Sequence, residues 1–528
     1  MIPLLTVALF CLQSGRNAIS QETGETMTIA IEDGESWWGG AVVDGQHMPF
    51  GGEQIERDFR ADTYGNQVQP LLISNRGRFV WCEEPIAFSI EGGVITVSSP
   101  TGDIESGRSG TTLRDVYRHV SRTYFPPDGE IPDTLLFTKP QYNTWIELQY
   151  DQREDRIRKY ADDIIASGFP PGVLMIDDNW QEDYGNWVFH PGRFTDPRDM
   201  MDSLHGKGFK VMMWVCPFVS PDSETFRALR KQQYLLKDEA GGIYIRRWWN
   251  GYSGLLDFTN PGAIEWFRER LSYLQTEYGV DGFKLDAGDA EFYPDGIVAH
   301  KPVSPNTHTE LWAEVGLAFP LNEYRACWKM AGKPLAQRLR DKRHNWADLG
   351  RLIPDAVAQG LIGYAFMCPD MIGGGEVGSF RNLDTIDQEL IVRSTQCSAL
   401  MPMMQFSVAP WRVLKPEYLA ICRDMAELHE HMGDEILSLA RDAAKTGEPI
   451  VRSLEYMFPG NNYAAIRDQF LLGERILVAP VLEKGAESRT VVFPEGRWRG
   501  DDGTLIEGPC IREIDAPLER LPWFRLDR

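Results

Sequence analysis

Short runs of alternating apolar and polar residues, broken by Gly, Asn, Asp and Pro, fill the chain from about Met27 to Pro132. Alternation with a period of two is typical of strands that bury one face, and we find no helical period in this region. The pattern predicts an antiparallel β-sandwich, to which we assign residues 21–135. Its predicted strands are Thr28–Ile31, Leu71–Ser74, Arg78–Trp81, Ile86–Ile90 and Val94–Ser98.

From Tyr142 onward, buried strands alternate with amphipathic helices. Eight predicted strands with helices between them, over about 270 residues, match the size and order of a (β/α)8 barrel, so the fold class is α/β. A doubly wound sheet is the alternative, but no Gly-rich phosphate loop follows the first strand. We assign residues 136–435 to the barrel. The predicted strands are Thr144–Leu148, Val173–Ile176, Lys210–Val215, Gly282–Leu285, Pro334–Gln337, Asn345–Ala347, Tyr364–Met367 and Leu400–Met404. The predicted helices are Gln152–Ser167, Met200–Gly206 and Pro261–Glu277.

After a helical stretch at Pro416–Ala444, the pattern returns to short strands at Phe470–Val481 and Arg489–Phe493, followed by Gly-rich turns. This part predicts a C-terminal β-sandwich over residues 436–528. Three domains agree with a length of 528 residues, which is too long for one hydrophobic core.

The first residues resemble a signal peptide, which we assign to residues 1–20. Ile2–Leu12 is apolar but too short to span a bilayer, and polar residues follow it. We therefore expect a secreted or periplasmic protein. A lipid tether at Cys11 is the alternative, and the bulky Phe10 disfavours it. No other segment is long and apolar enough to predict a membrane span.

The charge and the cysteines exclude several classes of function. The 77 acidic and 54 basic residues give a net charge of −23, which repels nucleic acid and anionic membranes and favours a neutral or cationic ligand. The eight cysteines are scattered, without a Cys-x-x-Cys pair and without His at ligand spacing. We therefore predict no metal site, no disulfide framework and no cofactor.

Polar and aromatic residues gather at the predicted carboxyl ends of the barrel strands, where catalytic groups of such barrels lie. Asp286 ends a strand that also carries Lys284, and both are out of place in a buried parallel strand unless something binds them. Taken singly, each is equally well explained as an ion pair or a cap. Together, carboxylates with aromatic walls suit the oxocarbenium-like transition state of glycoside hydrolysis. A serine hydrolase is excluded because there is no Gly-x-Ser-x-Gly elbow. The set is Asp177, Asp178, Trp214, Asp286, Arg338, Asp348 and Asp370, with Trp145 added from the first strand.

Two stretches carry a resemblance to a known family. Gly282–Asp289 resembles the nucleophile strand of glycoside hydrolase family 31, and Phe470–Leu482, followed by Arg489–Trp498, is similar to the family's segment after the barrel. The family combines a β-sandwich, a barrel and C-terminal sandwiches. The resemblance covers nearly the whole chain beyond the leader.

Departures from the common α-glucosidase pattern narrow the branch. This chain has Asp289 where those enzymes end the nucleophile motif in Glu, and Met404–Ser407 where they carry Arg-Asn-His. Trp346–Gly350, Cys368–Gly374 and Gln405–Ser407 are instead similar to the branch that contains the animal myogenesis-regulating glycosidase and bacterial α-galactosidases.

The resemblance implies a role for each matching residue. Asp286 matches the nucleophile and Asp348 the acid/base. The positions that match sugar-binding residues are Lys284, Arg338, Trp249, Asp177 and Asp178, to which the strand ends add Trp145 and Trp214. The short spacing around Arg338 leaves Arg340 as a competitor.

The expected function is a retaining, exo-acting α-glycosidase acting on an oligosaccharide or glycoside, first of all an α-D-galactoside. An α-glucosidase or α-xylosidase of the same family is the alternative within enzymes. A catalytically silent sugar-binding relative is the alternative of another class, and it would be expected to lack one of the two catalytic carboxylates. The sequence does not indicate the oligomeric state.

Overall fold

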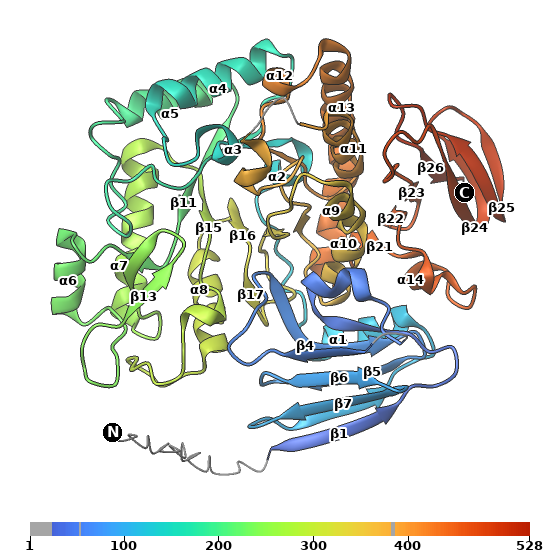
Figure 1. Cartoon of the computed structure of the whole chain (residues 1–528), viewed down its shortest axis with the longest axis horizontal. Coiled ribbons are helices and arrows are strands. Elements are labelled where there is room, and N and C mark those ends of the chain that lie inside the picture. The colour runs from blue at the N-terminus through green and yellow to red at the C-terminus, as the bar shows by residue number, and fades with distance from the viewer. Residues whose placement is uncertain (1–23, 52–53, 382–385, 528) are drawn as a thin grey trace, which may run out of the picture.

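The computed structural model describes residues 24–51, 54–381 and 386–527, so the predicted leader lies outside the described residues. In Figure 1 the N-terminal sheets (blue) lie below a central barrel (cyan to orange), and the C-terminal sheet (red) lies beside helix α13, Pro416–Thr446. The (β/α)8 barrel with flanking β domains is therefore confirmed.

Two sheets make up the N-terminal region. One has the order β1-β7-β6-β3, and the other has the order β17-β4-β5-β8 with β2 paired to β4. Strand β17 comes from the barrel part of the chain and pairs with β4 in parallel, so the second sheet is continuous with the barrel's connecting segments. The bounds are β1 Glu25–Ala30, β2 Trp37–Ala41, β3 Ile55–Asp58, β4 Gln67–Ser74, β5 Arg78–Cys82, β6 Ala87–Glu91, β7 Val94–Ser99, β8 Ile104–Arg108 and β17 Cys327–Trp328.

Helix α1, Leu113–Tyr124, corrects the prediction that this region has no helical period. Thr112 accepts a hydrogen bond from the backbone N–H of Asp115, and the Asp115 side chain accepts one in return from the backbone of Thr112. This capping box satisfies donors that would otherwise be free at the helix start. The helix buries Leu113, Val116 and Val120, which share one face at helical spacing.

The barrel sheet has eight parallel strands in the order β19-β18-β16-β15-β11-β10-β9-β20. An isolated parallel bridge between Met371 and Gln405 brings its two ends together, so the barrel is nearly closed. The bounds are β9 Gln141–Asn143, β10 Val173–Ile176, β11 Lys210–Val215, β15 Gly282–Leu285, β16 Asn322–Tyr324, β18 Gln337–Arg338, β19 Met367–Cys368 and β20 Gln405–Phe406.

Three of the predicted barrel strands coincide with no barrel strand, and one of them, Leu400–Met404, ends just before β20. Thr144–Leu148 lies beyond β9 and contains helix α3, Trp145–Leu148. Asn345–Ala347 is the start of helix α9, Trp346–Gly350, because the Asn345 side chain accepts a hydrogen bond from the N–H of Asp348 and caps the helix. The strand that the prediction missed is β16, which has only three residues, two of them polar.

The helices around the barrel begin at recognisable caps. Asn260 caps α7 with Pro261 as its first residue, and Asp196 caps α5 with Pro197 in the same place. The bounds are α4 Glu154–Ala166, α5 Pro197–Gly206, α6 Glu224–Gln232, α7 Pro261–Tyr273, α8 Pro305–Gly316, α10 Leu352–Leu361, α11 Gln388–Ala399 and α12 Pro410–Val413. A small sheet, β12 Phe218–Val219, β13 Ile245–Trp248 and β14 Gly251–Leu255, lies after β11.

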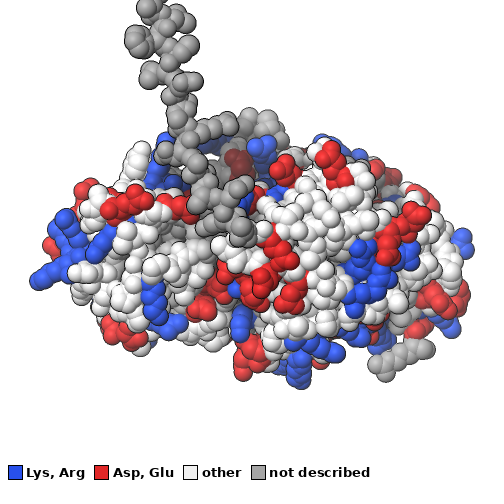
Figure 2. All heavy atoms as spheres, turned by 90° about the horizontal axis from the view of Figure 1, so that it is seen from below, with Lys and Arg blue, Asp and Glu red and all other residues white. Residues whose placement is uncertain are grey.

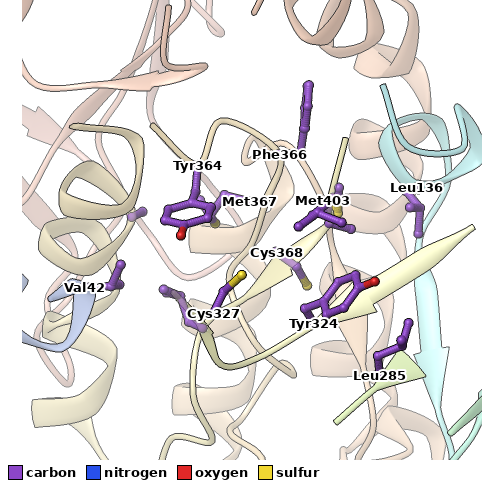
Figure 3. Close-up of a cluster of buried hydrophobic side chains, with 14 of the residues drawn as sticks. Val42, Leu136, Leu285, Tyr324, Cys327, Tyr364, Phe366, Met367, Cys368 and Met403 are labelled. Carbon is purple, nitrogen blue, oxygen red and sulfur yellow. The ribbon is translucent and has the colours of Figure 1, made fainter. Parts of the chain in front are cut away.

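A continuous apolar core joins the barrel to the N-terminal region. Figure 3 shows Leu285, Tyr324 and Cys368, from three barrel strands, in the same cluster as Val42 from the 3-10 segment η1, Val42–His47. All four side chains are buried. The N-terminal region is therefore packed as part of the core that supports the strand ends.

The C-terminal region is one six-stranded sheet in the order β21-β22-β23-β26-β24-β25. The bounds are β21 Val451–Arg452, β22 Phe470–Leu472, β23 Ile476–Val478, β24 Ser488–Gly500, β25 Leu505–Asp515 and β26 Trp523–Leu526.

No described helix is long and apolar enough to cross a membrane. On the face shown in Figure 2, acidic and basic side chains lie interspersed.

Candidate active site

A cavity of about 570 Å³ opens at the carboxyl ends of the barrel strands. Its volume lies within the range of about 300–1,000 Å³ that is typical of small-ligand sites. Eight of the predicted site residues line it: Trp145, Asp177, Asp178, Trp214, Trp249, Lys284, Asp286 and Arg338. Residues outside the predicted site set also line it, among them Tyr64, Tyr150, Asp289, Arg325 and Asp341.

Asp286 directly follows β15 and is held from both sides. Its Oδ1 accepts hydrogen bonds from Arg325 Nε at 3.1 Å and from the Ala287 N–H at 2.8 Å, and its Oδ2 accepts one from Trp214 Nε1 at 3.1 Å. Burial alone would raise the pKa of Asp286. The positive charges of Arg325, Lys284 and Arg338 outweigh burial, so this pKa lies well below the ordinary value of an aspartate. Asp286 is thus an ionised, oriented carboxylate.

Lys284 and Asp177 form a buried ion pair on the cavity wall. Lys284 Nζ lies 2.6 Å from Asp177 Oδ2, and their side chains are 5% and 4% exposed. Thr144 Oγ1 accepts a hydrogen bond from the Asp177 N–H at 3.0 Å, which fixes the backbone just after β10. A buried pair of this kind has oxygen and nitrogen atoms available for sugar hydroxyls without leaving a charge unpaired.

Asp178 also lines the cavity, because strand alternation lapses beyond Ile176, where β10 ends. Its Oδ1 accepts a hydrogen bond from the Tyr184 hydroxyl at 2.9 Å, and its Oδ2 accepts one from Asn250 Nδ2 at 2.6 Å. Burial and the charge of Asp177 raise the pKa of Asp178 to about 7. Of two adjacent carboxylates, one is therefore paired with a cation and the other titrates near neutrality.

Arg325 is the residue that sequence reasoning missed most clearly. It follows β16 and makes a two-pronged ion pair with Asp289, with Nη1–Oδ1 at 2.9 Å and Nη2–Oδ2 at 2.8 Å, in addition to its bond to Asp286. Because the three residues of β16 show no apolar strand pattern, the sequence predicts no strand end before Arg325. The available signal was Asn322-Glu323-Tyr324-Arg325, a polar segment after a long helix.

Arg338 ends β18 and connects two acidic residues. Its Nη1 donates to Asp341 Oδ1 at 2.6 Å and to Asp370 Oδ1 at 2.7 Å. Asp370 is fully buried and does not line the cavity, whereas Asp341 lines it with a side chain that is 46% exposed. Burial would raise the pKa of Asp341, but Arg338 and Lys284 lower it below the ordinary value.

The structure does not bring Asp348 to the cavity. Its Oδ2 accepts a hydrogen bond from the Arg343 N–H at 2.8 Å, and its own N–H is capped by Asn345. Asp348 lies in the first turn of α9. The sequence analysis had placed it after a strand at Asn345–Ala347, and that strand does not exist. Both Arg338 and its competitor Arg340 line the cavity.

Aromatic rings form the sides of the cavity. Trp145 donates its indole N–H to the Gly375 carbonyl at 3.0 Å and packs edge-on against Tyr150, with ring centroids 5.5 Å apart. Trp249 is 47% exposed and lies against Phe292 at 5.8 Å. Flat rings with polar edges suit the faces of sugar rings. Within the described ranges, no group of three or more His, Cys, Asp and Glu side chains could hold a metal ion.

Comparisons with known proteins identify one family over most of the chain. A family model described as "Glycosyl hydrolases family 31 TIM-barrel domain" matches residues 139–437, and one described as "Glycosyl hydrolase family 31 C-terminal domain" matches residues 447–525.

Two curated relatives show the range of similarity. The myogenesis-regulating glycosidase of Mus musculus is 31% identical over 523 residues, which cover 92% of this chain and 73% of the relative. Alpha-glucosidase 2 of Bacillus thermoamyloliquefaciens is 26% identical, covering 71% of this chain and 50% of the relative, so the match spans only half of that protein. Among solved structures, an α-xylosidase from a soil metagenome, complexed with xylose, matches with a TM-score of 0.84 at 21% identity, over 95% of this chain and 79% of its own.

Proposed function

The chain belongs to glycosyl hydrolase family 31, and from this membership and the cavity we propose that it is a retaining, exo-acting α-glycosidase that prefers α-D-galactosides. The observation that carries the proposal is Asp286, a buried carboxylate kept ionised by three cations at a barrel strand end. A carboxylate in this state can attack an anomeric carbon and stabilise positive charge there.

In the proposed first step, Asp286 attacks the anomeric carbon through Oδ2. Oδ1 is engaged by Arg325 and the Ala287 N–H, while Oδ2 accepts only the Trp214 N–H among the described groups. The C–O bond to the leaving group breaks and a covalent glycosyl-enzyme forms. Water then releases the sugar with the original configuration, which is the retaining outcome.

We assign the acid/base role to Asp341 in place of Asp348. The role requires a carboxyl group that touches the leaving oxygen and later a water molecule, and Asp341 combines a place in the cavity with access to solvent. Asp178 holds a proton nearer to neutrality, but it is 2% exposed and both of its oxygens already accept hydrogen bonds.

The first step needs a proton on Asp341, and Arg338 opposes it because a cation stabilises the carboxylate. We therefore expect turnover to be fastest on the acidic side of neutrality, with kcat falling as the pH rises and Asp341 loses its proton.

The preference for galactose rests on Cys368–Gly374 and Gln405–Ser407, which are similar to the α-galactosidase branch. Relatives described as α-glucosidases and an α-xylosidase support the alternative sugars. We propose that the Lys284–Asp177 pair and Asp178 bind the hydroxyls that distinguish these sugars.

A panel of para-nitrophenyl α-D-galactoside, α-D-glucoside and α-D-xyloside tests the proposal, with the configuration of the released sugar followed by NMR. The expected result is retention, with the highest kcat/KM on the galactoside. A higher value on the glucoside or xyloside would change the sugar while leaving the mechanism. Absence of turnover on all three would favour the sugar-binding alternative.

A further inference from the structure

The cavity contains four cationic side chains, and three of them are paired. Lys284 pairs with Asp177, Arg325 with Asp289, and Arg338 with Asp370. The fourth, Arg340, lines the same cavity, yet among the residues that the structure describes none forms a hydrogen bond or ion pair with its guanidinium.

Arg340 is also partly removed from water. It is partly buried, and burial together with the charge of Arg351 lowers its pKa. The carboxylates of Asp355, Asp348 and Asp44 act on it electrostatically, but none of these three described residues forms a hydrogen bond or ion pair with it. A partly desolvated guanidinium without a partner is unfavourable, and a ligand oxyanion would provide the missing charge-assisted hydrogen bonds.

The position of Arg340 indicates which part of a substrate it meets. It immediately precedes Asp341, whose carboxyl group we place beside the leaving oxygen. Tyr64, from the N-terminal region, also lines the cavity and, like Arg340, is influenced by the charge of Asp44. Both side chains therefore belong to the wall where the N-terminal region meets the barrel. The Lys284–Asp177 pair lies on β15 and at the end of β10.

We propose that Arg340 binds an anionic group, a carboxylate or a sulfate, on the leaving-group part of the substrate, so that the natural substrate is an α-glycoside of an acidic saccharide or other acidic aglycone. The proposal rests on the proposed glycosidase function. A planar guanidinium fork matches the two oxygens of a carboxylate or sulfate, which a lysine matches less well. The net charge of −23 repels anions at long range, so this recognition would act after entry into the cavity.

A matched pair of substrates tests this inference. Phenyl α-D-galactosides that carry a meta-carboxylate or a meta-carboxamide have nearly the same shape and differ in charge, and a meta-sulfonate serves as a stand-in for sulfate. For the wild type we expect kcat/KM to be about 10-fold higher on the carboxylate than on the carboxamide, and this preference to shrink at high ionic strength. Arg340→Gln should abolish the preference and Arg340→Lys should retain part of it.

Arg343→Gln is the matched control, because Arg343 is exposed and does not line the cavity. It should leave the preference unchanged. Equal kcat/KM of the wild type on all three substrates, or an equal loss on all of them in Arg340→Gln, would overturn the inference. A preference for the sulfonate alone would limit the class to sulfated aglycones.

Failure of the glycosidase proposal would be seen separately, as no hydrolysis of any of the three compounds by the wild type. In that case calorimetry with the same compounds still decides the role of Arg340. Tighter binding of the charged compounds that is lost in Arg340→Gln supports it, and equal affinities overturn it.

Discussion

Asp177 and Asp178 are neighbours in the sequence, but the structure gives their carboxylates different surroundings. Asp177 is paired with the buried cation Lys284, while Asp178 accepts hydrogen bonds from the neutral groups Tyr184 and Asn250. Their adjacency and their place after a strand could be predicted from the sequence. Their different hydrogen-bond and ion-pair partners could not, since these come from β15 and from the turn between β13 and β14.

The first prediction compares these two carboxylates. Asp177→Asn should lower kcat/KM on an α-galactoside by ~30-fold to ~1,000-fold, because it weakens charge-assisted bonds to the sugar and leaves Lys284 without its counter-charge. Asp178→Asn should lower kcat/KM less, because Asp178 is not the counter-charge of a buried cation and the amide oxygen can still accept one of its two hydrogen bonds. Kinetics of both variants with the same substrate, with thermal melting as the folding control, decide this. A larger loss for Asp178→Asn would reverse the assignment.

The second prediction separates Asp341 from Asp348. Asp341→Ala should lower kcat/KM by roughly 100-fold or more on a poorly activated phenyl α-galactoside, and far less on a dinitrophenyl one, which needs little protonation. Asp348→Ala, which removes only a contact to the Arg343 N–H, should change neither substrate's kcat/KM by more than about 3-fold. If Asp348→Ala showed the strong dependence on the leaving group instead, the sequence-based assignment would stand.

Among the elements, the length and polarity of a strand decide whether it can be recognised in the sequence. The longer apolar strands β10, β11 and β15 were located, since parallel barrel strands are apolar on both faces. The short strand β16 was missed, and helix α9 was mistaken for a strand. Both errors moved a site residue, because Arg325 follows β16 and Asp348 lies on α9. The sequence signal for that helix was Asn345, a common N-cap residue, followed three residues later by the acidic Asp348.

The third prediction concerns Arg325, at the end of β16. Its positive charge favours the ionised form of Asp286, so its removal should raise the pKa of Asp286. Activity requires the ionised form, and therefore the acid limb of the kcat/KM profile of Arg325→Gln should lie at higher pH than that of the wild type. A pH–rate profile measures this shift. An unchanged acid limb, with activity reduced equally at all pH values, would mean that Arg325 acts only on folding.

At the scale of the whole molecule, the N-terminal region helps to hold the active-site strands. Gln67 on β4 donates through Nε2 to the carbonyls of Arg325 and Arg338, and its Oε1 accepts a hydrogen bond from Gln359 Nε2 at 2.9 Å. The domain order was predicted from pattern changes alone. This buried network was not, because Gln67 is at least 258 positions away from each of these partners in the sequence.

The fourth prediction tests that network. Gln67→Ala leaves two buried carbonyls without their donor, so it should destabilise the protein by about 1–3 kcal/mol and lower both the melting temperature and kcat. Gln69→Ala is the matched control, since Gln69 is buried on the same strand but its amide makes no hydrogen bond within the described residues. Equal effects of the two substitutions would show that packing, and not the network, explains the loss.

The most direct test of the account is to locate the covalent intermediate. A C5-fluorinated α-galactosyl fluoride reacts with a retaining enzyme but is released slowly, because fluorine destabilises the positive charge of both transition states. We expect one sugar per protein molecule by intact mass, attached to the peptide that contains Asp286, and no labelling of Asp286→Ala. A label on any other carboxylate, or hydrolysis with inversion and without a label, would contradict it.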